Sequence, residues 1–262
     1  MDIYIFFPIV MGWFAGWIVN YLADVLPITR NFSQPACPQC NTEFTWKDYL
    51  LFKSCEHGHA RTVRTWTTPI LLAAISAYSW LNPPTKFEYW LGLVVLLYFG
   101  TIFVIDMEHR LILHPTSIVG SVLGLVVGLV SNGLVPTLLG GLAGFLIMLF
   151  FYYFGVLFSR IRAKRMRAQG LEVDDEEALG AGDVILAAIL GLMLGWPLIW
   201  FGLLLGILLG GAYGVLLVLF MLVVKRYKEN VLMVFMPYGP FFVLSAVFIL
   251  FLPDMIRAIV PK

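Results

Sequence analysis

Two aspartates lie at the ends of apolar segments, where ionised side chains are rare. Asp106 ends the segment 89–106 in FVIDMEHRLILHP, and Asp183 lies at the start of the segment 182–195 in GAGDVILAAILGLMLGW. A charge near the centre of a membrane span costs about 2.5–3.5 kcal/mol on insertion scales, so such residues usually face protein and serve a function. Two converging carboxylates can share one proton, so that one activates water while the other supports a carbonyl oxygen. We therefore predict that Asp106 and Asp183 are catalytic; the alternative is that each is an interfacial helix-end charge.

Two glycines precede the second aspartate, at Gly180 and Gly182. Glycine lets a backbone turn sharply and lets another chain come close. We therefore predict that these two positions allow a substrate strand to approach Asp183.

A second group of reactive side chains lies in a polar segment after the first apolar one. Cys37 and Cys40 have CxxC spacing, and Cys55 follows in CEHGH with His57 and His59. Three thiolates and one histidine satisfy four-coordinate zinc, and a site closed by four protein ligands is of the structural kind. The spacing predicts a zinc site with either histidine as fourth ligand; free cysteines in a polar loop are the alternative.

The elements that must position these residues are apolar helices. The chain has 262 residues, 60% of them hydrophobic and 13% charged, against about a quarter charged in soluble domains. We predict an all-α polytopic membrane protein with about eight transmembrane helices and a small zinc-binding cytoplasmic loop domain. The eight predicted segments are 3–25, 66–82, 89–106, 111–131, 135–159, 182–195, 197–224 and 238–253. The break at Gly195-Trp196-Pro197 fits either a tight turn or a kink within one long helix.

The distribution of basic residues predicts the orientation of the chain. Fourteen of the 17 Lys and Arg residues fall in loops after the first, third, fifth and seventh segments. The positive-inside rule then places these loops in the cytoplasm and both termini outside. Asp106 and Asp183 are accordingly expected at similar depth near the cytoplasmic face. The expected surroundings are a lipid bilayer, with no nucleic acid as a partner.

Composition also predicts the division of the chain. We expect a first transmembrane helix over 1–25, a cytoplasmic Cys-rich loop over 26–65 and a transmembrane catalytic domain over 66–262.

Five motifs in order resemble those of the bacterial type IV prepilin peptidases, which are membrane aspartic proteases of the G-x-G-D type. The motifs are GWIVNYLADVLP from Gly16, the cysteine loop, Asp106 followed by His109, EALGAGDVILAAILGLMLGW and MPYGPFFVLSA at 236–246. The resemblance covers nearly the whole chain. It implies an enzyme of the bacterial inner membrane that removes the leader peptide of type IV prepilins or pseudopilins at the cytoplasmic face. It also implies that Asp106 and Asp183 are the catalytic pair.

The same resemblance implies that the new N-terminus is methylated with S-adenosylmethionine. The chain departs from the family pattern at several positions. Ile185 replaces the usual Lys after the second aspartate, Gly58 occupies the fourth Cys position, and TWKDYLLF lacks the usual Glu-Asn pair. We expect methyl transfer, where present, to depend on the N-terminal half and to be separable from cleavage.

Two other interpretations of the sequence fit parts of this pattern. A related G-x-G-D protease, of the preflagellin peptidase or presenilin-like kind, would share the aspartates but lacks the N-terminal cysteine loop. A zinc-stabilised membrane transporter or scaffold would use its acids to bind ions, but a transporter should show internal repeats, and the sequence shows none.

Overall fold

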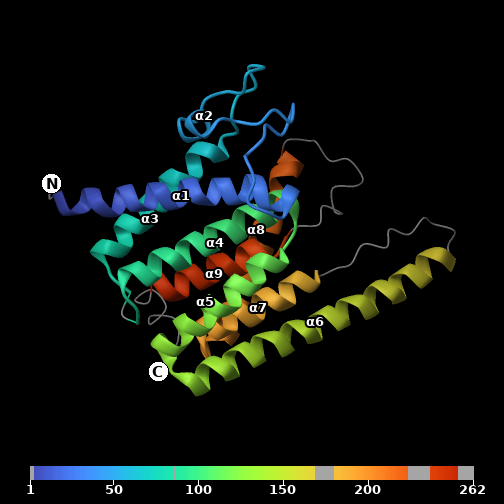
Figure 1. Ribbon diagram of the computed structural model, residues 1–262. Coiled ribbons are helices and arrows are strands. Elements are labelled where there is room, and N and C mark those ends of the chain that lie inside the picture. The colour runs from blue at the N-terminus through green and yellow to red at the C-terminus, as the bar shows by residue number, and fades with distance from the viewer. Residues whose placement is uncertain (1–2, 85, 169–179, 224–236, 253–262) are drawn as a thin grey trace. The chain divides into compact units, whose positions relative to one another are not determined.

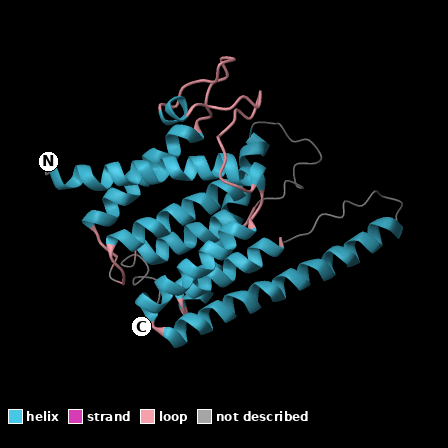
Figure 2. Ribbon diagram, viewed as in Figure 1, coloured by secondary structure: helices cyan, strands magenta, loops and turns pink. Residues whose placement is uncertain are grey.

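The described parts of the protein are mostly helical. A computed structural model describes residues 3–84, 86–168, 180–223 and 237–252. Figure 2 shows helices joined by loops, and within these ranges the only β pairing is an isolated bridge between Ala36 and Glu43. The predicted all-α class is confirmed.

Packing divides the chain into two compact units, which are described separately. The first unit is Met1–Leu111 with Leu250–Lys262, and the second is Ile112–Ile249. The helices of the first unit are α1 (Ile3–Thr29), α2 (Trp46–Leu50), α3 (Arg64–Leu81) and α4 (Tyr89–His109). The helices that lie wholly or mostly in the second are α5 (His114–Asn132), α6 (Leu134–Ala168), α7 (Ala181–Leu194), α8 (Leu198–Val223) and α9 (Gly239–Phe251). The functional division expected at residues 25 and 65 stays a prediction.

Each of the eight predicted apolar segments is a helix, and α2 is an additional short helix within the polar segment. Among the described residues, five helices are long and apolar enough to cross a membrane: α1, α4, α5, α6 and α8. Two other apolar helices, α7 and α9, are shorter. The protein is therefore a multi-pass membrane protein, while the count of eight spans stays a prediction. The largest difference in bounds is at α6, whose 35 residues continue past the predicted end at 159.

In the first unit, α1 lies against α3 through two glycines one turn apart (Figure 1). A Cβ at Gly12 would come within 2.6 Å of the Ala73 Cα, and one at Gly16 within 2.4 Å of the Pro69 Cα. Small residues at this spacing let helix backbones approach closely in a membrane. Further along α1, the buried Asn20 side chain donates to the Thr65 carbonyl (3.0 Å). This contact holds the end of α1 against the start of α3.

In the second unit, α7 packs closely against α6 (Figure 1). A Cβ at Gly140 would lie 2.3 Å from the Gly191 carbonyl oxygen, and one at Gly144 would lie 2.3 Å from that of Ala187. The Gly140-xxx-Gly144 spacing therefore serves helix packing. This contact fixes the position of α7, the helix that carries Asp183.

The break after α7 separates two helices and is not a kink in one. Gly195 ends α7 with φ of +74°, a backbone conformation that favours glycine. The amide of Trp196 donates to the Pro136 carbonyl (2.9 Å), and α8 begins at Leu198. In α9, the buried Ser245 hydroxyl donates to the Gly202 carbonyl of α8 (2.8 Å).

Several residues on which the sequence predictions rest fall outside the described parts. They are the acidic residues 174–177, the basic residues at 225, 226 and 228, the side chains of residues 165–167, and Met236 of the last motif.

Candidate active site and metal centre

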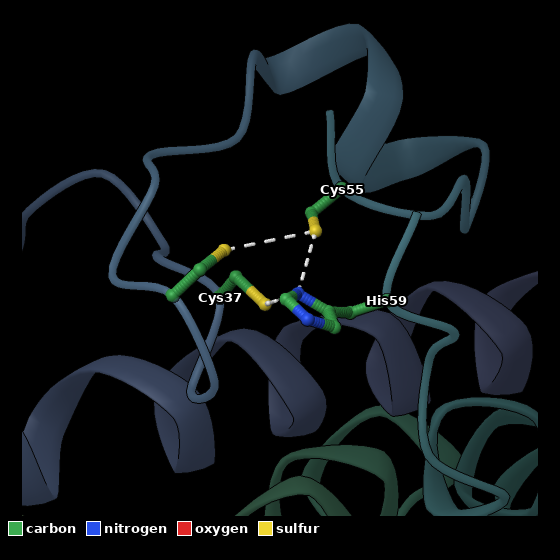
Figure 3. A group of neighbouring side chains, drawn as sticks. Cys37, Cys55 and His59 are labelled. Atoms are coloured by element: carbon green, nitrogen blue, oxygen red, sulfur yellow. Dashed lines mark hydrogen bonds between the residues drawn. The ribbon is translucent and has the colours of Figure 1, made fainter. Parts of the chain in front are cut away.

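The metal loop, residues 30–63 between α1 and α3, brings three cysteines and one histidine together. Sγ of Cys37, Cys40 and Cys55 and a ring nitrogen of His59 all lie within 4.8 Å of one another. Figure 3 shows the His59 ring joined by dashed lines to the sulfurs of Cys37 and Cys55. The His59 Nδ1 lies 3.2 Å from the Cys55 Sγ. The Cys40 and Cys55 sulfurs are 3.7 Å apart. The ligand atoms of these four residues therefore lie close enough together to bind one metal ion.

The geometry chooses between the two histidines that the sequence left open. His59 belongs to the cluster, whereas His57 Nδ1 lies 3.2 Å from the Thr42 hydroxyl. That hydroxyl is in turn 2.8 Å from the Cys40 Sγ. Among the described residues, His57 thus contacts the cluster through Thr42 and does not belong to it. Thr42 was not identified from the sequence, because a single threonine after CxxC carries no distinguishing signal.

Two similar turns form the loop around the cluster. The amide of Asn41 donates to the Cys37 carbonyl (2.8 Å), and the amide of Gly58 donates to that of Cys55 (2.8 Å). Asn41 has φ of 56° and Gly58 has φ of 79°, and asparagine and glycine adopt this left-handed region most readily. Gly58, which stands where the family pattern has a cysteine, is therefore required by its turn, and His59 supplies the fourth ligand position.

The cluster fits a metal ion such as zinc. In a regular tetrahedron with Zn–S bonds of about 2.3 Å, two sulfurs lie about 3.8 Å apart, close to the separation of Cys40 and Cys55. Cys37 and Cys55 are buried within the loop. Side-chain and backbone hydrogen bonds from Thr42 lower the pKa of the Cys40 thiol to about 5, which favours the thiolate that binds metal. Burial raises the pKa of the Cys55 thiol.

Asp106 lies in the last turn of α4 and is only 5% exposed. Its carbonyl accepts a hydrogen bond from the amide of Arg110, whose φ of 54° ends the helix. Two residues after Asp106, the Glu108 carboxylate forms an ion pair with Arg64, the first residue of α3 (Nε to Oε1, 2.7 Å). The end of α4 that carries Asp106 therefore lies beside the start of α3, where the metal loop ends.

Arg64 also pairs with Asp24 of α1, a contact that the sequence reasoning missed. Asp24 is a lone carboxylate within an otherwise apolar segment of α1. The rule that drew attention to Asp183 applies equally to Asp24. The partner could not be read from the sequence, since 40 residues separate Asp24 from Arg64.

Asp183 lies in the first turn of α7, and its amide donates to the Gly180 carbonyl (3.0 Å). Gly180 has φ of −76°, which any residue adopts. Gly182 is packed against Ile112, because a Cβ at Gly182 would lie 2.9 Å from the Ile112 Cβ. A role of these glycines in substrate approach stays a prediction. Asp106 belongs to the first unit and Asp183 to the second, so the pairing of the two carboxylates also stays a prediction.

Comparison with known families gives one match, which spans both aspartates. Residues 91–215 match the type IV leader peptidase family. No match was found among curated proteins or among solved structures. The family implies a protease that acts on peptide substrates, and neither this match nor the described residues support binding of S-adenosylmethionine. The match over residues 91–215, which run from the first turn of α4 into α8, supports the assignment of this multi-pass membrane protein to the type IV leader peptidase family.

Proposed function

We propose that this protein is a membrane-embedded aspartic endopeptidase that removes the leader peptide of type IV prepilins or pseudopilins at the cytoplasmic face. Asp106 and Asp183 are the catalytic pair in this proposal. The observation that carries it is the match to the leader peptidase family over residues 91–215, a stretch that contains both aspartates.

The local structure around each aspartate supports the pair. Each carboxylate lies at the end of an apolar helix, Asp106 in the last turn of α4 and Asp183 in the first turn of α7. If α4 runs toward the cytoplasm and α7 away from it, as the basic loops predict, both lie at the same face. The contact of Gly182 with Ile112 supports the pairing further, because Ile112 follows Asp106 by only six residues.

Two carboxylates at one membrane face provide what peptide hydrolysis requires. The ionised carboxylate takes a proton from water, and the resulting hydroxide oxygen bonds to the scissile carbonyl carbon. The protonated carboxylate donates its hydrogen bond to the oxyanion that forms. When the C–N bond breaks, the proton that was taken from water passes to the leaving amine. Both carboxylates are needed, and one of them must carry a proton.

The metal loop has a structural role in this proposal. Cys37, Cys40, Cys55 and His59 would hold one zinc ion, whose bonds would cross-link the loop. A zinc ion held by these four residues would have no open coordination position for water, so the proposal assigns catalysis to the aspartates.

The experiment is cleavage of a prepilin by purified protein in liposomes. Asp106→Asn and Asp183→Asn should each lower the cleavage rate at least a hundredfold, the lower end of the usual loss for an acid–base catalyst. Asparagine preserves the volume of the side chain and removes only the titrating group. Glu88→Gln is the matched control, since Glu88 is an exposed carboxylate at the opposite end of α4 and should leave the rate unchanged. Cleavage by either asparagine variant at more than about a hundredth of the wild-type rate would exclude the catalytic pair.

A further inference from the structure

The metal loop is joined to α1 by the side chain of Tyr49. The buried core of the loop contains Tyr49 together with the metal-cluster residues Cys37 and Cys55. Burial, and then the neighbouring Asp24 carboxylate, raises the pKa of Tyr49, so the phenol keeps its proton. The Tyr49 hydroxyl donates a hydrogen bond to the Asp24 Oδ2 of α1 (2.5 Å). A residue of the folded loop is therefore hydrogen-bonded directly to a carboxylate at the end of α1.

A second contact from the loop supports the position of Tyr49. The guanidinium of Arg61 lies over the Tyr49 ring, 4.2 Å from its centroid, and over the Phe44 ring at 4.5 Å. Such stacking of Arg on aromatic rings is attractive and depends on the ring position. The orientation of Tyr49 thus depends on the fold of the metal loop, which the cluster of three cysteines and His59 closes.

Arg64 connects Asp24 to the end of α4. Its NH2 group pairs with the Asp24 Oδ1, and its Nε lies 2.7 Å from the Glu108 Oε1. Its NH1 group donates to the Asn20 Oδ1 (3.3 Å). The Arg64 side chain is only 17% exposed, so these charges are more costly to leave unpaired than charges on an open surface. One guanidinium therefore holds α1 and the last turn of α4 together.

We propose that Arg64 is a positioning residue that transmits the folding of the metal loop to the last turn of α4, so that metal binding orders the turn that carries Asp106. The path runs from the metal cluster through Tyr49, Asp24 and Arg64 to Glu108, all within the first unit. The consequence for cleavage rests on the proposed role of Asp106, whereas the coupling itself does not.

The physical argument is that one guanidinium contacts three side chains at once, Asn20 and Asp24 through hydrogen bonds and Glu108 through an ion pair, which a single point charge cannot reproduce. When the metal is removed, the loop loses the bonds that close it, and Tyr49 loses its fixed position. Asp24 then loses the hydrogen bond that orients its carboxylate toward Arg64. Since coupling between two sites is reciprocal, weakening the Arg64 contacts should also weaken metal binding by the loop.

The test is hydrogen exchange in residues 103–109 of the purified full chain, with zinc bound and after chelation. In the wild type, chelation should raise the exchange rate of these amides at least about fivefold, the lower end of the usual coupling between sites. In Arg64→Gln, exchange should be fast in both states, and zinc affinity should fall by a similar factor. Arg64→Lys retains the charge without the planar fork and should recover part of the zinc response. An unchanged zinc response in Arg64→Gln would overturn the proposal.

Two further variants separate coupling from general loss of fold. Glu108→Gln leaves the Asp24–Arg64 pair intact and removes only the contact with α4, so it should abolish the zinc response of residues 103–109 while the loop still binds zinc. Lys53→Gln breaks a pair within the loop, between Lys53 and Asp48, and should leave the response unchanged. A normal zinc response in Glu108→Gln, or its loss in Lys53→Gln, would each contradict the path through Arg64.

Cleavage assays distinguish this inference from the proposed function. Arg64→Gln should lower kcat with little change in KM, because Arg64 acts on the turn of Asp106 and not on the substrate. Asp106→Asn should keep the zinc response of residues 103–109 and lose cleavage. If Asp106→Asn retains cleavage, the proposed function fails and the coupling stands. If Arg64→Gln retains the zinc response, the coupling fails and the proposed function stands.

Discussion

Gly182, in the first turn of α7, lies against Ile112, so that a Cβ at position 182 would come within 2.9 Å of the Ile112 Cβ. Position 180 is different, because a Cβ there would meet its nearest neighbour, the Asp183 Oδ2, at an ordinary 3.8 Å. Of the two glycines in the Gly-Ala-Gly-Asp motif, only Gly182 is required by its contact with the rest of the fold.

This difference gives a prediction for two alanine variants. Gly182→Ala should destabilise the protein by about 1–3 kcal/mol, the usual cost of overpacking, and should displace the turn that carries Asp183. Gly180→Ala should change stability by less than about 1 kcal/mol, because its side chain has room. Thermal unfolding in detergent and the cleavage rate measure both effects. Equal stability of the two variants would show that the contact with Ile112 does not constrain the motif.

The metal cluster predicts a difference between its two histidines. His59→Ala removes a ring nitrogen from the cluster, so zinc bound per chain should fall well below one equivalent on elemental analysis after dialysis. His57→Ala is the matched control, since His57 lies beside Thr42 and the His59 ring but is not itself in the cluster, and its loss should leave the zinc content near one equivalent. Comparable zinc loss in both variants would mean that His57 is also a ligand.

The packing of α6 on α7 predicts a large effect at Gly144. A leucine there would place its Cβ 2.3 Å from the Ala187 carbonyl oxygen, so Gly144→Leu should cost about 3 kcal/mol or more. Gly211→Leu in α8 is the control, because a Cβ at Gly211 meets no described atom within 4 Å. The unfolding temperature in detergent should fall for the first variant and stay near the wild-type value for the second. A wild-type unfolding temperature for Gly144→Leu would show that the two backbones are not in contact.

The distribution of basic residues predicts the orientation of the protein. An alkaline phosphatase fused after Lys164, near the end of α6, should be inactive because the enzyme requires export, and one fused after Asn82, just past α3, should be active. The opposite pattern would reverse the orientation and place Asp106 away from the cytoplasm.

The helices could be predicted from the sequence because runs of apolar residues form helices in lipid whatever their neighbours are. The prediction of segment 182–195 differs from α7 by one residue at each end. The end of α6 was less predictable, because RIRAKRMR is charged yet continues the helix to Ala168. Charge marks where an apolar span ends, whereas the end of a helix depends on its capping and on its packing.

The site could be predicted only in part. Residue types indicate which side chains could do chemistry, but they do not indicate which residues those side chains contact. Asp106, Asp183 and the three cysteines were singled out by residue type and spacing alone. The choice of His59 over His57 depends on the turn at Gly58, which directs the two side chains differently. The pairs of Arg64 with Asp24 and Glu108 join residues 40 and 44 positions apart, and no local pattern encodes such a contact.

The length of α7 has a consequence for the membrane around it. Its 14 residues extend over about 21 Å, whereas the hydrocarbon layer is about 30 Å thick. If α7 crosses the membrane, as the prediction of eight spans requires, local thinning of the bilayer is one way to relieve this hydrophobic mismatch. A peptidase in lipid must bring water to a peptide bond, and a thinned layer shortens the distance that water travels to reach Asp183. A 20-residue helix at this position would remove the mismatch and, with it, the shorter route for water.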